Sequence, residues 1–203
     1  MLLNLRKSIV KELVEEMTEY EKKIIITEDE YCARKSLATK ESRKILQTNY
    51  YYDTEHFDLC KEGITCRIRK KDNKYTATIK YHNKNEKESS VEKSVPAKNE
   101  FDSSLFDKMG VRLQGALFTE RIIIFEDEGI EVALDKNTYL GINDYELEIE
   151  YSPDRASEAE NLLEEFAHAL YLDDVVVSID NFIKRKEHPK SKSERFFERK
   201  KLL

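Results

Sequence analysis

The sequence predicts an α+β fold built on an antiparallel β-barrel or a strongly curved sheet. Short segments in which polar and apolar residues alternate recur along the whole chain, and a period of two is the period of a β-strand. Few stretches show the spacing of an amphipathic helix, and no long linker, repeat or low-complexity tract divides the chain. Many strands combined with few helices are typical of an antiparallel barrel or curved sheet.

Each expected strand follows from alternation and from the turn residues beside it. The segment Lys71-Asp72-Asn73-Lys74 fits a hairpin turn between two strands, and Glu126-Asp127-Glu128-Gly129 fits a second turn. The strands are expected at about Thr18–Ile26, Gln47–Tyr52, Ile64–Lys70, Tyr75–Tyr81, Ser89–Val95, Leu117–Glu126, Ile130–Lys136 and Asp144–Ser152.

The expected helices are marked by apolar spacing and by caps. Thr27 with Glu30 forms a capping box that opens a helix through about Leu37. Further helices are expected within residues 1–17, over Asn99–Met109 before Gly110, and from Pro153 through about Leu170. We therefore expect an N-terminal amphipathic helix, residues 1–17, followed by a single domain, residues 18–203. That domain ends in a basic tail, Lys184–Leu203, expected to be a solvated helix or loop, or otherwise to cover one end of the barrel.

Composition narrows the functional classes. The chain has 203 residues and a net charge of -6, so it is a poor candidate for general nucleic-acid binding. Its three cysteines show no CxxC spacing, which favours free thiols in a reducing cytosol over a zinc site or a disulfide framework. No apolar run approaches the roughly 20 residues needed to span a bilayer. We expect a cytoplasmic protein with neither a nucleic-acid nor a membrane partner.

One strand has an unusually acidic face. Alternation over Asp144–Tyr151 places on one side three carboxylates, Glu146, Glu148 and Glu150, opposite a face of tyrosine, leucine and isoleucine. Carboxylates at two-residue spacing repel one another, and a hard divalent cation bound by oxygen ligands would offset that repulsion. The strand near the N-terminus repeats the pattern with Glu19, Glu21 and Lys23.

Basic residues are concentrated on the middle strands. Arg67 and Arg69 share a face, Lys80 follows on the next strand, and Arg121 lies on a strand that is apolar on both faces. Each face could be the solvated side of an ordinary sheet. If the polar faces instead point into a barrel, burying so many charges would require water or a charged ligand. Guanidinium and ammonium groups suit phosphate, and carboxylates suit Mg²⁺ or Mn²⁺, so a short polyphosphate with a metal is the ligand implied.

These residues also carry a family resemblance. Glu19-x-Glu21-x-Lys23 resembles the ExExK signature of the CYTH superfamily, the triphosphate tunnel metalloenzymes, and most of all their small bacterial members. The later elements of that family are matched in order, from about residue 18 to 185, by Arg67-x-Arg69, Lys80, Glu92 (or Glu88), Arg121, Asp135 and Glu146-x-Glu148-x-Glu150. The resemblance implies an eight-stranded antiparallel β-barrel tunnel with flanking helices.

The resemblance also implies roles for individual residues. On this basis we expect metal ligation of Mg²⁺ or Mn²⁺ by Glu19, Glu21, Asp135, Glu146, Glu148 and Glu150. We expect the substrate to be bound by Lys23, Arg67, Arg69, Lys80, Arg121 and Lys184, where Arg185 and the tail are alternatives to Lys184. The expected catalytic residues are Glu92, Lys80 and Arg121.

The activity implied is metal-dependent hydrolysis of triphosphates, with inorganic triphosphate as the first expectation. Adenylate cyclase, which makes cyclic AMP from ATP, and thiamine triphosphatase are alternatives on the same scaffold. From a different class, a polyphosphate- or nucleotide-binding module without turnover is a further alternative. The expected partner is a small triphosphate-containing molecule. The chain is expected to be a monomer or a homodimer, because the N-terminal helix could either cover one end of the tunnel or pair subunits.

Overall fold

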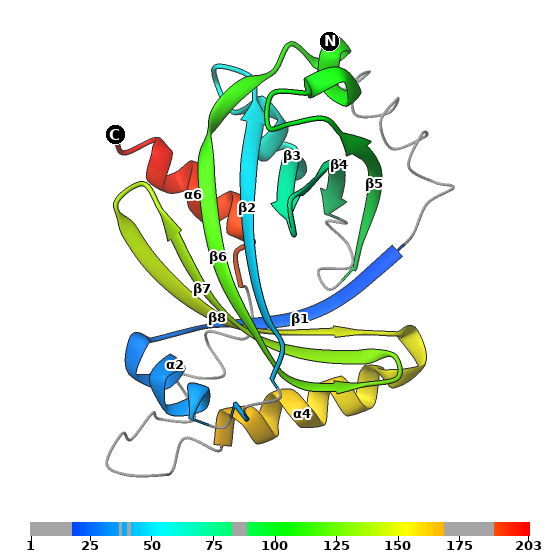
Figure 1. Cartoon of the computed structure of the whole chain (residues 1–203), viewed down its shortest axis with the longest axis vertical. Helices are drawn as coiled ribbons and strands as arrows, with labels where there is room; N and C mark the ends of the chain where they lie inside the picture. Colours follow the sequence, from blue (N-terminus) through cyan, green and yellow to red (C-terminus); the bar gives the residue numbers. More distant parts are fainter. Residues whose placement is uncertain (1–17, 37, 40–41, 83–88, 169–188) are drawn as a thin grey trace. The chain divides into compact units, whose positions relative to one another are not determined.

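A computed structural model describes residues 18–36, 38–39, 42–82, 89–168 and 189–203. Eight strands form a closed antiparallel barrel in the order β1-β5-β4-β3-β2-β6-β7-β8, which confirms the predicted fold class (Figure 1). The helix expected within residues 1–17, together with Glu88, Lys184 and Arg185, lies outside the described residues. Within the described residues, no helix has the length and apolar character that crossing a membrane requires.

The elements agree with the sequence pattern, although most strands are longer than expected. The ladder of backbone hydrogen bonds continues past the residues whose side chains alternate clearly, and β6 begins five residues earlier than predicted. Asn99–Met109, expected as an α-helix, contains only a short 3-10 helix. The elements are β1 Thr18–Ile26, α2 Glu28–Lys35, β2 Lys44–Asp53, α3 Asp58–Lys61, β3 Ile64–Lys71, β4 Lys74–His82, β5 Ser89–Ala97, η1 Ser103–Met109, β6 Arg112–Asp127, β7 Ile130–Tyr139, β8 Ile142–Tyr151, η2 Pro153–Arg155, α4 Ala156–His168 and α6 Lys192–Lys200.

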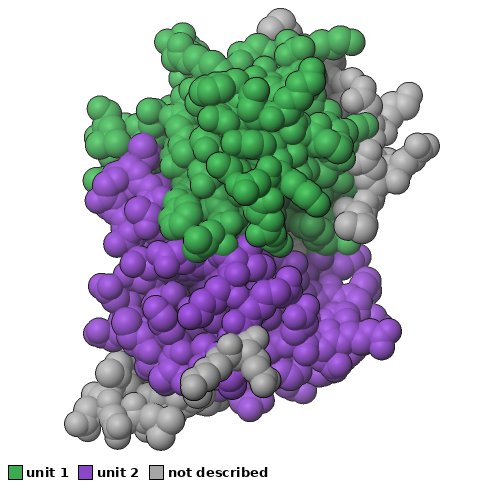
Figure 2. Space-filling model, in the orientation of Figure 1, with its two compact units in different colours: residues 1–19, 46–118, 191–203 green, residues 20–45, 119–190 purple. Residues whose placement is uncertain are grey.

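The chain divides into two compact units, which are coloured separately in Figure 2. Unit 1 comprises Met1–Glu19, Leu46–Phe118 and Ser191–Leu203, and unit 2 comprises Tyr20–Ile45 and Thr119–Lys190. Each unit has its own apolar core among the described residues. Each apolar core therefore stabilises the strand pairing within its own unit.

In unit 2, helices α2 and α4 lie on one side of β7 and β8 (Figure 1). Thr27 caps α2 as predicted: its hydroxyl accepts the Glu30 backbone N–H at 3.2 Å, and the Glu30 carboxylate accepts the Thr27 N–H at 2.6 Å. Leu147 and Ile149 are fully buried in the core that includes Ala159 and Leu163 of α4. The apolar strand faces therefore point toward the helices, and the polar faces point the other way.

Unit 1 is organised in the same manner around β3, β4 and β5. Cys66, Ile68 and Ala77 are buried in a core that includes Phe106 of η1. The predicted hairpin turn between β3 and β4 is present, with Asp72 and Asn73 at φ values of 50° and 59°. Positive φ at both central residues is the signature of a type I′ turn, whose twist matches that of the flanking strands. This turn fixes the pairing of β3 with β4.

Helix α6 contradicts the expectation that the basic tail is solvated. Phe196 and Phe197 are buried, and their rings lie 5.0 and 5.9 Å from the Tyr51 ring. Tyr51 pairs with Arg67 in the β2–β3 register, so α6 packs on the strand face that carries Arg67. The segment is rich in charged residues, but its two adjacent phenylalanines form an apolar side. A helix needs only one such stripe to pack, whatever its overall charge.

Truncating Phe196 is expected to destabilise the protein. Removing a fully buried aromatic side chain leaves a cavity and costs about 3–5 kcal/mol in the free energy of unfolding. The matched control is Phe101→Ala, because that phenylalanine is 67% exposed. Thermal and urea unfolding of both variants should show a large loss for Phe196→Ala and a change within about 0.5 kcal/mol for Phe101→Ala. Equal small losses would show that α6 does not contribute to the folded core.

Candidate active site

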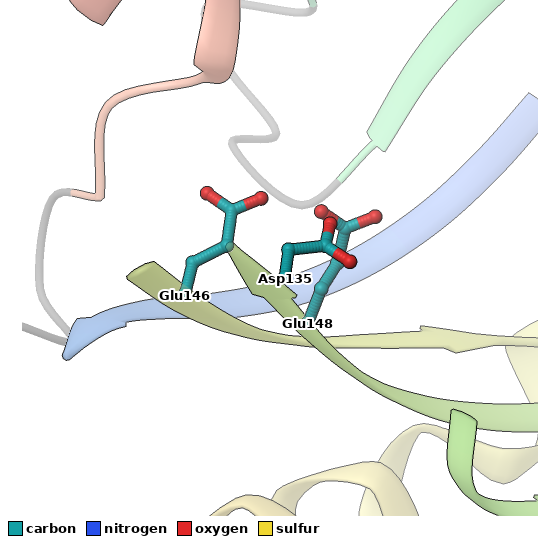
Figure 3. Close-up of side chains that lie close together, drawn as sticks. All are labelled: Asp135, Glu146 and Glu148. Carbon is teal, nitrogen blue, oxygen red and sulfur yellow. The ribbon is translucent and has the colours of Figure 1, made fainter. Parts of the chain in front are cut away.

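Three carboxylates meet in unit 2 on the face that points away from the helices. Asp135 on β7 pairs directly with Glu146 on β8, and Glu148 lies two residues further along β8. One oxygen from each of the three lies within 4.8 Å of the others. All three side chains are buried and project from the same face of the strands (Figure 3). Alternation along β8 thus places Glu146 and Glu148 on one face, and the β7–β8 register adds Asp135 to them.

Arg121 of β6 binds this acidic cluster. Its Nε and Nη2 atoms each donate to one oxygen of Asp135 at 2.8 Å, and Nη2 also donates to Glu148 at 2.7 Å. Burial by itself lowers the pKa of the Arg121 guanidinium, but the Glu148 and Asp135 carboxylates more than reverse this and raise it well above its ordinary value. Arg121 is therefore a fixed positive charge among carboxylates.

Glu150 lies at the edge of the same cluster. Its side chain is 51% exposed, and its carboxylate accepts a hydrogen bond from Arg121 Nη1 at 3.0 Å. Partial desolvation and the neighbouring Glu148 carboxylate raise the pKa of Glu150 to about 7, although Arg121 acts in the opposite direction. Because desolvation and a neighbouring negative charge disfavour the ionised form of Glu150, a further cation nearby would stabilise that form.

The predicted acidic and basic residues of β1 separate into two groups. Lys23 pairs with Glu148 in the β1–β8 register and Glu21 pairs with Glu150, so both lie on the face of the acidic cluster. Lys23 Nζ is 2.6 Å from a carboxylate oxygen of Glu21. Glu19, by contrast, belongs to unit 1, where its carboxylate accepts a hydrogen bond from Lys80 at 2.9 Å.

The acidic cluster fits a hard divalent cation. Asp135, Glu146 and Glu148 offer only carboxylate oxygens, which are the donors that Mg²⁺ and Mn²⁺ prefer. Arg121 adds a positive charge that holds the Asp135 and Glu148 carboxylates in place. The donor chemistry of the cluster therefore suits a metal ion.

A second site lies in unit 1, where cationic side chains line a cavity of about 310 Å³. The strand register places Arg67 opposite Thr78 and Arg69 opposite Thr76, and continues from Thr78 to Ser94 on β5. Glu92 also lines the cavity, 3.4 Å from Arg67. The cavity is bounded by Arg67, Arg69, Lys71, Asp72, Lys74, Thr76, Thr78, Glu92 and Ser94.

Two buried donors beside this cavity have no hydrogen-bond partner among the described residues. They are Arg67 Nε and Asn49 Nδ2. Asn49 also orients the neighbouring cation, because its Oδ1 accepts a hydrogen bond from Arg69 Nε at 3.0 Å. Buried polar groups are nearly always paired, so unpaired donors next to guanidinium groups indicate an anionic ligand.

The structure thus brings together the sequence-predicted residues in three groups. Arg67, Arg69 and Glu92 meet at the cavity, and Lys80 lies one rung away, opposite Thr65 and Glu92. Lys23, Glu21, Arg121, Asp135, Glu146, Glu148 and Glu150 meet in unit 2, and Glu19 pairs with Lys80. The sequence analysis missed Asn49, Lys71 and Lys74. Extending the alternation of Gln47–Tyr52 and of the hairpin would have placed all three on the polar face.

The fold is thus a closed eight-stranded antiparallel β-barrel, with an acidic cluster in unit 2 and a cavity lined by cationic side chains in unit 1. The family model described as the CYTH domain matches residues 17–176, and the chain belongs to this family.

One curated relative is similar over part of the chain, and solved structures share the fold. The chain is 30% identical over 117 residues to YjbK of Bacillus subtilis, which is provisionally named a triphosphatase. That match covers 51% of this chain and 61% of YjbK. A provisionally named adenylate cyclase from Bacillus halodurans has a TM-score of 0.61 at 24% identity, over 88% of this chain and 97% of that one. HpAC1 from Hippeastrum, described as having a dominant triphosphatase activity, has a TM-score of 0.56 at 22% identity, over 73% and 88%.

Proposed function

We propose that the protein is a metal-dependent hydrolase of triphosphates and that its substrate is inorganic triphosphate. The observation that carries this proposal is the cavity beside Arg67. The described residues that line it are all polar or charged, and two buried donors next to it lack a partner within that part of the chain. A site for an organic ligand is usually lined by apolar and aromatic side chains. A cavity without them suits a ligand made only of phosphate groups.

In this proposal, Arg67 and Arg69 bind phosphate oxygens. A guanidinium group offers a planar pair of donors that matches two phosphate oxygens, and Asn49 already orients Arg69 for this. Lys80 adds a point charge on the neighbouring rung. Lys23, Arg121 and Lys184 complete the proposed substrate-binding set; Lys184 lies outside the described residues.

We assign the metal to the acidic cluster, where Asp135, Glu146 and Glu148 would hold Mg²⁺ or Mn²⁺. Glu19, Glu21 and Glu150 complete the proposed set of ligands. A bound divalent ion would neutralise charge on the phosphate oxygens and polarise the bond to be broken. Arg121 meanwhile holds the Asp135 and Glu148 carboxylates in fixed positions through its hydrogen bonds, so the cluster is organised in advance.

The proposed roles of the catalytic residues follow from their neighbours. Glu92 lies at the cavity wall within reach of Arg67, where a carboxylate can accept a proton from an attacking water and orient it. Lys80 and Arg121 would stabilise negative charge on the transferred phosphoryl group. Phosphoryl transfer needs little covalent help from the protein, so positioning and charge neutralisation are expected to supply most of the rate enhancement.

The name of the relative YjbK supports the hydrolase over the cyclase, since that protein is named as a triphosphatase. A cyclase needs a surface for the adenine base, and the cavity's described lining residues include no aromatic or aliphatic side chain on which a base could stack. We place the activity in the cytoplasm, acting on a small molecule.

The test is phosphate release from inorganic triphosphate with Mg²⁺, with Mn²⁺ and with EDTA, beside ATP assayed for both phosphate and cyclic AMP. We expect fast release from triphosphate in the two metal arms, little release from ATP and none in EDTA. Cyclic AMP and pyrophosphate from ATP would establish a cyclase instead. Binding of triphosphate without turnover in any arm would establish a non-catalytic binding module.

A further inference from the structure

The cationic cavity extends beyond the arginines of β3 toward the tip of the β3–β4 hairpin. Lys71 continues the face of Arg67 and Arg69, because side chains two residues apart on a strand share a face. Lys74 pairs with Lys71 across the hairpin, and both lysines line the cavity. Arg67, Arg69 and Lys71 therefore follow one another along the cavity, and Lys74 lies beside Lys71 at its hairpin end.

The two ends of this row differ in exposure. At the inner end, Thr65 and Lys80 are buried, and the Thr65 hydroxyl forms a 2.8 Å hydrogen bond with Ser193 of α6. At the hairpin end, Lys71 is partly exposed and Lys74 is exposed. Within unit 1, α6 therefore covers the inner end of this strand face, and the cavity meets solvent at the two lysines.

The two lysines differ from Arg121 in their partners. Arg121 is held by several carboxylates, whereas neither Lys71 nor Lys74 lies within ion-pair distance of a carboxylate among the described residues. Asp72 also lines the cavity at the turn, but outside that distance from both lysines. Two ammonium groups at the entrance of a cationic cavity thus remain available to a ligand.

We propose that Lys71 and Lys74 form an outer anion-binding subsite that binds the phosphate groups of linear polyphosphates longer than triphosphate. From Arg67 to Lys71 the backbone advances about 13 Å, at the strand rise of about 3.3 Å per residue. Charges spread over that length suit an extended anion, and the polar and charged lining residues among those described favour such an anion over a base or ring. This proposal rests on the proposed function in that it takes Arg67 and Arg69 as the inner phosphate site.

The experiment compares the binding of inorganic triphosphate and linear tetraphosphate by titration calorimetry, beside their steady-state hydrolysis. The key variant is Lys71→Gln/Lys74→Gln. We expect its affinity for tetraphosphate to fall about tenfold, while its affinity for triphosphate falls less than about threefold. The wild type should bind tetraphosphate at least as tightly as triphosphate. Equal losses for the two ligands, or no loss, would overturn the proposal.

The chain supplies a matched control in Lys70. This lysine lies on the opposite face of β3, with its Nζ 5.6 Å from the centre of the Tyr75 ring. Lys70→Glu changes the net charge by two, as the double variant does, but leaves the cavity unaltered. We expect Lys70→Glu to keep the wild-type ratio of affinities. If Lys70→Glu lowered the affinity for tetraphosphate as much as the double variant does, the loss would come from the change in net charge and not from a subsite at Lys71 and Lys74.

The two proposals fail separately. Calorimetry does not depend on turnover, so a wild type that hydrolyses neither ligand, yet loses tetraphosphate binding in the double variant, would refute the hydrolase and keep the subsite. If the wild type hydrolysed triphosphate and the double variant bound tetraphosphate as tightly as the wild type, the subsite would be refuted and the hydrolase kept. Absence of tetraphosphate binding in the wild type would also overturn the subsite. Thermal melting of each variant shows whether it is folded before its affinities are compared.

Discussion

Glu148→Gln is expected to lower metal-dependent phosphate release from inorganic triphosphate by about a hundredfold or more. Glu148 is buried, lies within 4.8 Å of Asp135 and Glu146, and accepts a hydrogen bond from Arg121. Glutamine has nearly the same shape but no charge, so the substitution removes a metal ligand without opening a cavity. Calorimetric titration with Mn²⁺ should show a parallel loss of metal affinity, which separates a lost metal site from a lost substrate site.

The control for this prediction is Glu120→Gln, since Glu120 is exposed and immediately precedes Arg121 on β6. It removes one negative charge beside the cluster but no member of it. We expect its activity and Mn²⁺ affinity to stay within about twofold of the wild type. Full activity of Glu148→Gln in Mg²⁺ would refute the assignment of the metal to this cluster.

Arg67→Ala is expected to raise the KM for triphosphate by about tenfold or more, because charge-assisted hydrogen bonds to phosphate are among the strongest polar contacts a protein makes. The Arg67 guanidinium lines the cavity, and its Nε is a buried donor with no partner among the described residues. Its loss should also weaken triphosphate binding measured in EDTA. Metal affinity should be unchanged, because Arg67 is a cation and is not among the proposed metal ligands.

Arg112→Gln serves as the control for Arg67→Ala. Arg112 also belongs to unit 1, but it is exposed and pairs with Glu55 on the surface. Its substitution should leave KM within about twofold of the wild type. A similar rise in KM for both variants would mean that overall charge, and not a phosphate contact at Arg67, governs substrate binding.

The acidic cluster was accessible to sequence reasoning because its geometry is local. Glu146 and Glu148 share a face by alternation alone, and Asp135 joins them through the short connection that pairs β7 with β8. The cationic cavity was accessible for the same reason, since one hairpin holds Arg67, Arg69 and their partners. The order of the motifs along the chain then indicated the CYTH family, to which the chain belongs.

Arg121 shows where sequence reasoning stopped. Its strand is apolar on both faces, a pattern that favours burial, and its exposed fraction is 10%. Its contacts with Asp135 and Glu148 depend on the lateral packing of β6 against β7. No local pattern encodes that contact, because the two side chains come from different strands and meet only when the register is set.

By itself, the sequence determined the positions of the strands, their polar and apolar faces, the hairpin turn and the charged character of each site. These follow from periods and turn residues that act over a few positions. Only the tertiary structure decided that Glu19 pairs with Lys80, that Asn49 orients Arg69, and that α6 packs on the face of Arg67. Each of these contacts joins residues distant in the chain. They depend on which strands are neighbours and on how buried surface is shared, and both are properties of the assembled barrel.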